Sequence, residues 1–340
     1  MSAIEVRDVT KDFVLRRRVG RVRRERVVVR AIDSLSLSIE TGEMVGYIGP
    51  NGAGKSTMIK ILTGILLPTS GSVRVAGLDP QRHRVATARR VGVVFGQRSQ
   101  LWWDLPLGDS FDLLRSVYRV PAARHAANLA MFADLLDLGP FLGTPVRQLS
   151  LGQRMRGEIT AALLHDPAVV YLDEPTIGLD VVSKGRVRDF LAQINAERGV
   201  TVVLTTHDLD DVERLCSRLV VVDQGRLVYD GTLDEVKARY APYRTLVVDL
   251  APGSAAPGAG ALRHATLVRS DGPRHWIRFH RDQTTAAAIV STLADIRDLT
   301  VEEPDIEEVV KQMYAHTAAP PEVSAQSVSM RPKNAETSYE

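Results

Sequence analysis

The clearest chemical pattern in the sequence is the nine-residue stretch GPNGAGKST, from Gly49 to Thr57. Its spacing matches G-x-x-x-x-G-K-[ST], a loop whose glycines let backbone N–H groups surround phosphate oxygens. Lys55 adds a positive charge at the β- and γ-phosphates, and the Ser56 hydroxyl can bind Mg²⁺. An apolar run precedes the loop and a helical pattern follows it, a context that favours a phosphate site over an ordinary glycine-rich turn. The candidate phosphate-binding residues are Gly49, Pro50, Asn51, Gly52, Ala53, Gly54, Lys55, Ser56 and Thr57.

Two acids end a second apolar run, VVYLDEP, at residues 169–175. Asp173 can hold Mg²⁺, usually through water, and Glu174 lies one step farther along, where it can polarise an attacking water. Such a pair could also be a solvated turn or a helix cap. In a chain that carries a phosphate loop, the metal-binding and catalytic interpretation is favoured.

The segments around these residues predict the elements that position them. Apolar runs bounded by turns occur at 168–173 and 201–206, and helical periodicity lies between them at 181–198. This alternation predicts a parallel sheet with helices packed on it, an α/β fold. Apolar spacing within 108–148 indicates a helical insert. Further strands are expected at 3–9, 30–48, 71–77 and 91–95, and further helices at 58–66 and 153–165.

The stretch LSLGQRMRGE, at 149–158, lies between the two phosphate motifs. With it, the ordered set of motifs resembles the ATP-binding-cassette (ABC) ATPases, whose signature is LSGGQ. Gln97 in FGQRSQ, Asp180 in GLD and His207 in LTTHD fall at the family's other motif positions. The resemblance covers residues 1–240. It implies a P-loop NTPase fold of the ABC type, with a helical subdomain at about 98–165, and Mg²⁺-dependent ATP hydrolysis.

The resemblance also implies roles for single residues. Glu174, His207 and Gln97 would be catalytic: His207 would hold the γ-phosphate and help position water, while Gln97 would sense Mg²⁺ and connect the two lobes. Mg²⁺ would be held by Ser56, Gln97 and Asp173. Two ATP molecules would be sandwiched head to tail in a homodimer or heterodimer. Further nucleotide contacts would come from Ser150, Gly152, Gln153 and Asp180. Phe13 would stack on adenine, with filling of the apolar face of its strand as the alternative.

One position departs from the family pattern, because Leu151 stands where the second glycine of the signature is usual. This puts in doubt how closely the loop approaches ATP. Gly152 is retained, and the helix expected after LSLGQ can still turn its N-terminus toward an anion.

The composition is that of an ordinary globular protein, with 340 residues, 44% apolar, 25% charged and a net charge of +2. The single cysteine, Cys216, excludes an intrachain disulfide and fits a reducing cytosol. No apolar run approaches the roughly 18 to 20 residues that span a bilayer. The start, MSAIEVRD, lacks the apolar segment of a signal peptide. Any membrane role is therefore expected through a partner or at the surface.

A second region is expected to begin near residue 241. Strand patterns at 243–250, around SDGP and at 297–302, with helical patterns at 283–295 and 306–315, predict a small C-terminal α+β module over 241–316. The segment 317–340 is rich in Pro, Ser and Ala and poor in aromatics, and is expected to be a disordered tail.

Two functions remain open for such an ATPase: a transporter subunit, or a soluble factor that acts on nucleic acid or the ribosome. The chain has one cassette, and the paired Trp102 and Trp103 follow Gln97 at the hinge where the family docks its membrane subunit. These features favour a transporter subunit that contacts separate permeases through residues 97–106. The whole arrangement resembles ATPases of ABC-2 type exporters, which implies outward transport from the cytoplasmic face of the membrane.

Residues 16–26, RRRVGRVRRER, carry seven arginines and one acid. They are expected to form a basic insert that interrupts strand structure. In a transporter subunit the insert would lie near an anionic membrane surface or the cytoplasmic loops of the permease. A solvated loop without a partner is the alternative, and nucleic acid is the partner that the soluble-factor hypothesis would require.

Overall fold

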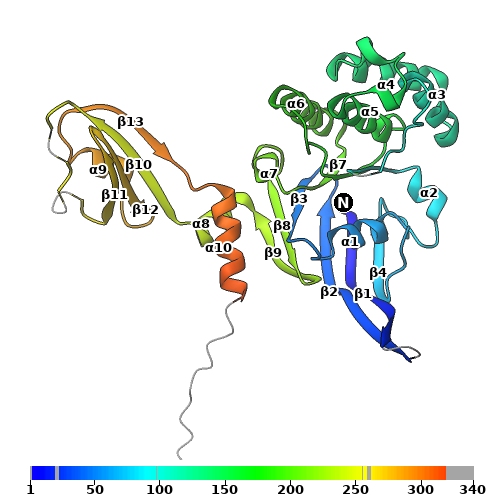
Figure 1. Cartoon of the computed structure of the whole chain (residues 1–340), viewed down its shortest axis with the longest axis horizontal. Coiled ribbons are helices and arrows are strands. Elements are labelled where there is room, and N and C mark those ends of the chain that lie inside the picture. The colour runs from blue at the N-terminus through cyan, green and yellow to red at the C-terminus, as the bar shows by residue number, and fades with distance from the viewer. Residues whose placement is uncertain (1, 20–22, 97, 255, 259–261, 319–340) are drawn as a thin grey trace, which may run out of the picture.

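The computed structural model describes residues 2–19, 23–96, 98–254, 256–258 and 262–318. A central six-stranded sheet lies beside a three-stranded antiparallel sheet, and several helices gather at one end of this unit (Figure 1). We call the two sheets and the helices packed on them the cassette. A separate four-stranded sheet stands apart from it (Figure 1). Within the described residues, no helix has the length and apolarity needed to cross a membrane.

The central sheet has the strand order β5-β6-β7-β3-β8-β9, parallel except for β9. Strands β3 and β7 are buried along their whole length, as continuous apolar strands in a parallel sheet must be. Because β7 lies between β3 and β6, the segments that follow these three strands meet at one edge of the sheet. The strands are β3 (Met44–Ile48), β5 (Val91–Phe95), β6 (Val169–Asp173), β7 (Thr201–Thr205), β8 (Arg218–Asp223) and β9 (Arg226–Thr232).

The antiparallel sheet has the order β2-β1-β4 and contains a long hairpin. Its strands are β1 (Ser2–Val19), β2 (Arg23–Glu40) and β4 (Ser70–Val75). The prediction that the arginine block interrupts the strands is wrong, because β1 and β2 stay paired as far as Val19 and Arg23. The run Val27–Val29 has high β-propensity and continues the antiparallel ladder into the basic residues.

The helices form two groups, one around the central sheet and one in the helical subdomain. Phe132 of the subdomain and Phe190 of the helix that follows β6 join the groups, since their rings meet edge to face with centroids 5.4 Å apart. Around the sheet lie α1 (Lys55–Leu62), α2 (Arg84–Ala88), α6 (Val181–Arg198), α7 (Leu209–Leu215) and α8 (Leu233–Tyr240). The helical subdomain contains α3 (Leu107–Tyr118), α4 (Ala122–Leu135), α5 (Leu151–Leu163) and two short 3₁₀ turns at Gly139–Phe141 and Val146–Gln148.

The C-terminal sheet has the order β11-β12-β10-β13 and its own small apolar core. Its elements are β10 (Tyr243–Leu250), β11 (Ala265–Asp271), β12 (Arg274–His280), α9 (Ala286–Val290) and β13 (Ile296–Glu302). The chain then returns to the cassette, where α10 (Ile306–Ala318) buries Val309 and Met313 in the same core as Val236 of α8. Most of the expected disordered tail, residues 319–340, lies outside the described residues.

Candidate active site

The phosphate loop lies between β3 and α1 and needs glycine at two tight approaches. Gly54 has φ 100°, and a Cβ there would lie 2.5 Å from the carbonyl oxygen of Ala31. A Cβ on Gly49 would lie 2.3 Å from the carbonyl oxygen of Val222. Both glycines therefore allow the loop to bend closely against neighbouring backbone, with its N–H groups at the start of α1.

Lys55 is the first residue of α1 and its side chain folds back over the loop. Its Nζ donates hydrogen bonds to the carbonyl oxygens of Gly49, at 2.5 Å, and Pro50, at 3.1 Å. Partial burial lowers the pKa of Lys55, while the charges of Glu174 and Asp173 oppose that shift. The ammonium group is thus held over the phosphate loop.

A cavity of about 560 Å³ joins this loop to the acidic strand end. The structure brings both predicted phosphate motifs and His207 to its walls, as expected for segments that follow neighbouring parallel strands. Its lining residues are Ala31, Asn51, Gly52, Ala53, Gly54, Lys55, Ser56, Thr57, Lys60, Ile65, Phe95, Gly96, Arg98, Asp173, Glu174, Ile177 and His207.

Asp173, the last residue of β6, is oriented by the next strand. The hydroxyl of Thr205 donates a hydrogen bond of 2.5 Å to Asp173 Oδ1. The Ser56 hydroxyl lines the same cavity. Hydroxyl and carboxylate oxygens, with phosphate oxygens and water, are the ligands that Mg²⁺ prefers, so these residues fit that ion.

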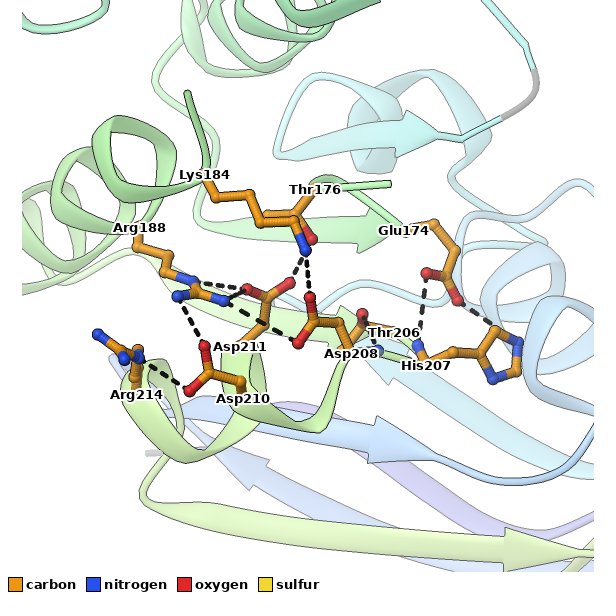
Figure 2. Close-up of polar contacts among 10 residues, drawn as sticks. All are labelled: Glu174, Thr176, Lys184, Arg188, Thr206, His207, Asp208, Asp210, Asp211 and Arg214. Atoms are coloured by element: carbon orange, nitrogen blue, oxygen red, sulfur yellow. Dashed lines mark hydrogen bonds and ion pairs between the residues drawn. The ribbon is translucent and has the colours of Figure 1, made fainter. Parts of the chain in front are cut away.

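Glu174 is held in an uncommon backbone conformation, with φ 55°. Its N–H donates to the carbonyl oxygen of Thr205 at 2.8 Å. Its carboxylate lies 3.4 Å from the backbone nitrogen of His207 and 3.5 Å from that residue's Nε2 (Figure 2). Burial raises the pKa of Glu174. A strained, half-buried carboxyl with raised proton affinity suits a general base.

Proteins that resemble this chain in sequence are ATP-binding proteins of ABC transporters. A family model described as ABC transporter matches residues 32–177. The daunorubicin resistance ATP-binding protein DrrA3 of Streptomyces coeruleorubidus is 32% identical, over 82% of this chain and 90% of that protein. The ABC transporter ATP-binding protein NatA of Bacillus subtilis is 31% identical, over 62% of this chain and 85% of that protein. The chain belongs to the ABC transporter family.

Solved structures of ABC ATPases have the same fold as the cassette. An ATP-binding subunit of an ABC transporter aligns with a TM-score of 0.61 and 26% identity, over 70% of this chain and 93% of that one. A dimeric ATP-binding cassette in a post-hydrolysis state, bound to ADP and Pi, aligns with a TM-score of 0.58 and 27% identity. The alignment covers 68% of this chain and 98% of that one. The protein is thus an ATP-binding subunit of the ABC type, and the predicted fold class is confirmed.

Five further predicted nucleotide contacts of this ABC subunit are not among the described residues that line the cavity: Phe13, Ser150, Gly152, Gln153 and Asp180. Phe13 lies on β1 opposite Val29, with the Lys11 ammonium 5.2 Å from its ring centroid. Gln97 lies outside the described residues, although its neighbours Gly96 and Arg98 line the cavity.

The signature LSLGQ forms the start of α5, which begins at Leu151, slightly earlier than expected. Ser150 caps the helix: its Oγ accepts from the backbone N–H of Gln153 at 3.2 Å, and the Gln153 side chain accepts from the Ser150 N–H at 2.9 Å. The side chain of Leu151 occupies space next to Gly178, where a Cβ would lie 2.5 Å from Leu151 Cδ2. The unusual leucine therefore packs against the segment between Glu174 and Asp180.

Asp180 is the N-cap of α6 and is exposed. Its carboxylate accepts from the backbone N–H of Ser183 at 2.9 Å and from the Ser183 hydroxyl at 2.7 Å. These hydrogen bonds lower the pKa of Asp180. In the single chain, Asp180 therefore has a defined capping role at the surface.

Sequence analysis missed a contact between the signature helix and the segment after Gln97. Glu158 of α5 is buried, and it accepts hydrogen bonds from the Ser99 hydroxyl and from the Gln100 backbone N–H, the latter at 3.2 Å. Burial raises the pKa of Glu158. Its place within LSLGQRMRGE was visible in the sequence, but nothing there indicated which segment it contacts.

Proposed function

We propose that this ABC subunit hydrolyses ATP in the presence of Mg²⁺ and couples the hydrolysis to transport by a separate membrane permease. The observation that carries this proposal is the cavity in which the phosphate loop faces Asp173, Glu174 and His207. The cavity contains the charges that a nucleoside triphosphate requires and a candidate base for water.

Each group has a distinct task in this proposal. Lys55 and the loop N–H groups hold the β- and γ-phosphates, and Ser56 and Asp173 hold Mg²⁺. The ion supplies neutralisation of phosphate charge. Glu174 accepts the proton of the attacking water, and its raised pKa supports that role. His207 orients the water and the γ-phosphate.

The complete site is proposed to need a second copy of the chain. Ser150, Gly152, Gln153 and Asp180 are absent from the lining of the cavity, which supports their use by a partner. A homodimer with two ATP molecules between its subunits would bring each signature to the phosphate loop of the other subunit. The dimeric cassette with ADP and Pi is a precedent for such an assembly.

The permease is proposed to dock on residues 97–106. Trp102 and Trp103 are 40% and 49% exposed, and large exposed aromatics are typical of interface cores. Arg154 of α5 lies 5.5 Å from the centre of the Trp103 ring, so such a contact would reach the signature helix.

Outward transport, from the cytoplasmic face of the membrane, is proposed from the likeness to exporter ATPases. A methionine import protein, MetN of Latilactobacillus sakei, is also 36% identical over 65% of this chain.

The arginine hairpin, defined here as residues 14–19 and 23–28, is proposed to bind an anionic membrane surface. Its register places Arg16 opposite Arg26 and Arg18 opposite Arg24. Like charges directly opposite each other destabilise a β-ribbon, and an anionic surface would relieve that repulsion. Val14 and Val28 of the hairpin are exposed, which gives the ribbon apolar contacts for the lipid interface.

The central test is the Glu174→Gln variant. We expect it to bind ATP, to lose about 10³-fold in turnover, and to accumulate as a closed dimer, because only the base is removed. Phosphate release, nucleotide binding and size-exclusion chromatography measure the three outcomes. Wild-type turnover in this variant would contradict the role of Glu174.

A further inference from the structure

A cluster of charged side chains joins α6 to the start of α7, the helix that follows His207. We call it the α6–α7 cluster: Lys184 and Arg188 of α6, and Asp208, Asp210 and Asp211 at the start of α7 (Figure 2). None of the five lines the nucleotide cavity. Neither the motifs nor the proposed reaction has assigned them a role.

Asp211 is the centre of the α6–α7 cluster and its side chain is fully buried. Arg188 Nε donates to Asp211 Oδ1 at 2.6 Å, and the hydroxyl of the buried Thr176 donates to Oδ2. Arg188 also pairs with Asp210, at 2.9 Å. A buried carboxylate with these partners has one favourable arrangement, since loss of a partner leaves an uncompensated charge.

The start of α7 is held by side chains of α6 and by the Thr206 hydroxyl, which accepts a hydrogen bond of 2.9 Å from the Asp208 backbone N–H (Figure 2). Asp208 is the N-cap residue, but its side chain makes no capping hydrogen bond. The carboxylate is instead paired with Lys184, and it lies 4.0 Å from Arg188. The position of the residue before it, His207, therefore depends on contacts with α6.

The same cluster is close in the chain, or through its contact with Thr176, to three residues with proposed roles: Glu174, His207 and Asp180. Thr176 follows Glu174 by two residues, Asp208 follows His207 directly, and α6 begins immediately after Asp180. The contacts between His207 and Glu174 are long, at 3.4 and 3.5 Å, so a small displacement of α7 would separate them.

We propose that Arg188 and Asp211 are positioning residues, which hold the start of α7 so that His207 stays beside Glu174. Arg188 acts through its fork of N–H groups, which reaches Asp211 and Asp210 together. This inference rests on the proposed hydrolytic function, because it concerns the rate of that reaction and not the binding of nucleotide.

The test compares turnover with nucleotide binding in Arg188→Met and Asp211→Asn. We expect kcat to fall by about tenfold or more, because small displacements of reacting groups can cost about 10²-fold in rate. The KM for ATP and the Kd for a fluorescent ATP analogue should stay within about threefold, because Lys55 and Ser56 are untouched. Trapping of ADP with vanadate, which requires the assembled centre, should weaken along with kcat.

Two further variants separate positioning from stability. In Arg188→Lys one charge is kept but the fork is lost, so kcat should be intermediate while the melting temperature stays near that of the wild type. In the double variant Arg188→Met with Asp211→Leu the buried charges are gone, so the melting temperature should recover while kcat stays low. Recovery of wild-type kcat in the double variant would overturn the proposal.

Arg218→Met is the matched control. Arg218 of β8 is also partly buried between two carboxylates, Asp230 at 2.7 Å and Glu43 at 3.0 Å, but it is outside the α6–α7 cluster. It should lower the melting temperature and leave kcat per folded subunit unchanged. Equal losses of kcat in Arg218→Met and Arg188→Met would overturn the inference, and a wild-type protein without ATPase activity would instead refute the proposed function.

Discussion

The carboxyl edge of the central sheet and the arginine hairpin both concentrate charge, but they do so in opposite ways. At the sheet edge, each charged group has a different neighbour: Lys55 the loop carbonyls, Asp173 the Thr205 hydroxyl, Glu174 the His207 backbone. In the hairpin, the same residue type recurs at opposed positions of a ribbon that extends away from the cassette (Figure 1). We therefore expect the proposed hydrolysis at the sheet edge to depend on the geometry of single side chains, and the proposed membrane binding of the hairpin to depend on its total charge.

This difference predicts how each region responds to change. A single substitution at the sheet edge should be severe and barely sensitive to salt, since partly buried charges are screened weakly. Single substitutions in the hairpin should be mild and additive, and salt should mimic them. The expected effect on turnover decreases from Lys55→Ala, through the titration of Glu174, to the substitution of the hairpin arginines.

Lys55→Ala should reduce turnover by at least about 10²-fold, because it removes the ammonium group that is held over the phosphate loop by the Gly49 and Pro50 carbonyls. Ser150→Arg should be similarly inactive if the signature serves the other subunit. Mixed dimers of the two variants would retain one intact composite site, so the mixture should regain activity that neither variant has alone. Phosphate release across mixing ratios measures this, and a mixture as inactive as its components would favour a site within one chain.

The pH dependence of kcat should report Glu174. Burial raises its pKa, so the protonated and inactive carboxyl persists to higher pH than usual. Below that pKa, kcat should fall by about tenfold per pH unit. Steady-state rates between acidic and neutral pH measure this, and a midpoint within the ordinary glutamate range would contradict it.

The same shift has a consequence for stability. A carboxyl whose pKa is raised by folding contributes stability below its unfolded pKa and loses that contribution as the pH rises through its folded pKa. Ionised Glu174 therefore costs stability at neutral pH, and Glu174→Gln should melt no lower than the wild type there.

Replacing Arg16, Arg18, Arg24 and Arg26 with Gln should leave soluble ATPase activity within about twofold, because none of these residues belongs to a phosphate motif. Binding to vesicles that contain anionic lipid should weaken by at least about tenfold, since each basic residue contributes about 1 kcal/mol near such a surface. Vesicle co-sedimentation with increasing salt should reproduce the loss in the wild type.

The control for this variant replaces four exposed arginines of the C-terminal sheet region with Gln: Arg263, Arg269, Arg278 and Arg297. It changes net charge equally and should retain vesicle binding. Equal losses in both variants would assign the effect to net charge alone. Wild-type binding to duplex DNA or RNA with a steep salt slope, together with no vesicle binding, would favour the soluble-factor hypothesis.

The sequence by itself indicated the chemistry that is proposed for the sheet edge. The residue types and spacing of the loop Gly49–Thr57 predict phosphate binding, and the run that ends in Asp173 predicts Mg²⁺ binding. Many strands and helices were also predicted, because apolar periodicity is local. The continuation of β1 and β2 into the basic residues was not predicted, and neither were the elements from Leu209 to Tyr240. The helix expected at 283–295 was predicted too long, because only Ala286–Val290 is helical.

Tertiary structure decided which distant segments meet. Strand order, which no local pattern encodes, places β7 between β3 and β6 and so brings His207 to Glu174. The backbone approach of Gly54 to Ala31 and the burial of Asp211 under Arg188 join residues far apart in the chain. The same holds for α10, which follows the C-terminal sheet yet packs in the cassette core. The physical reason is that burial and charge pairing stabilise contacts between residues that are close in space. A local sequence pattern contains information only about residues that are close along the chain.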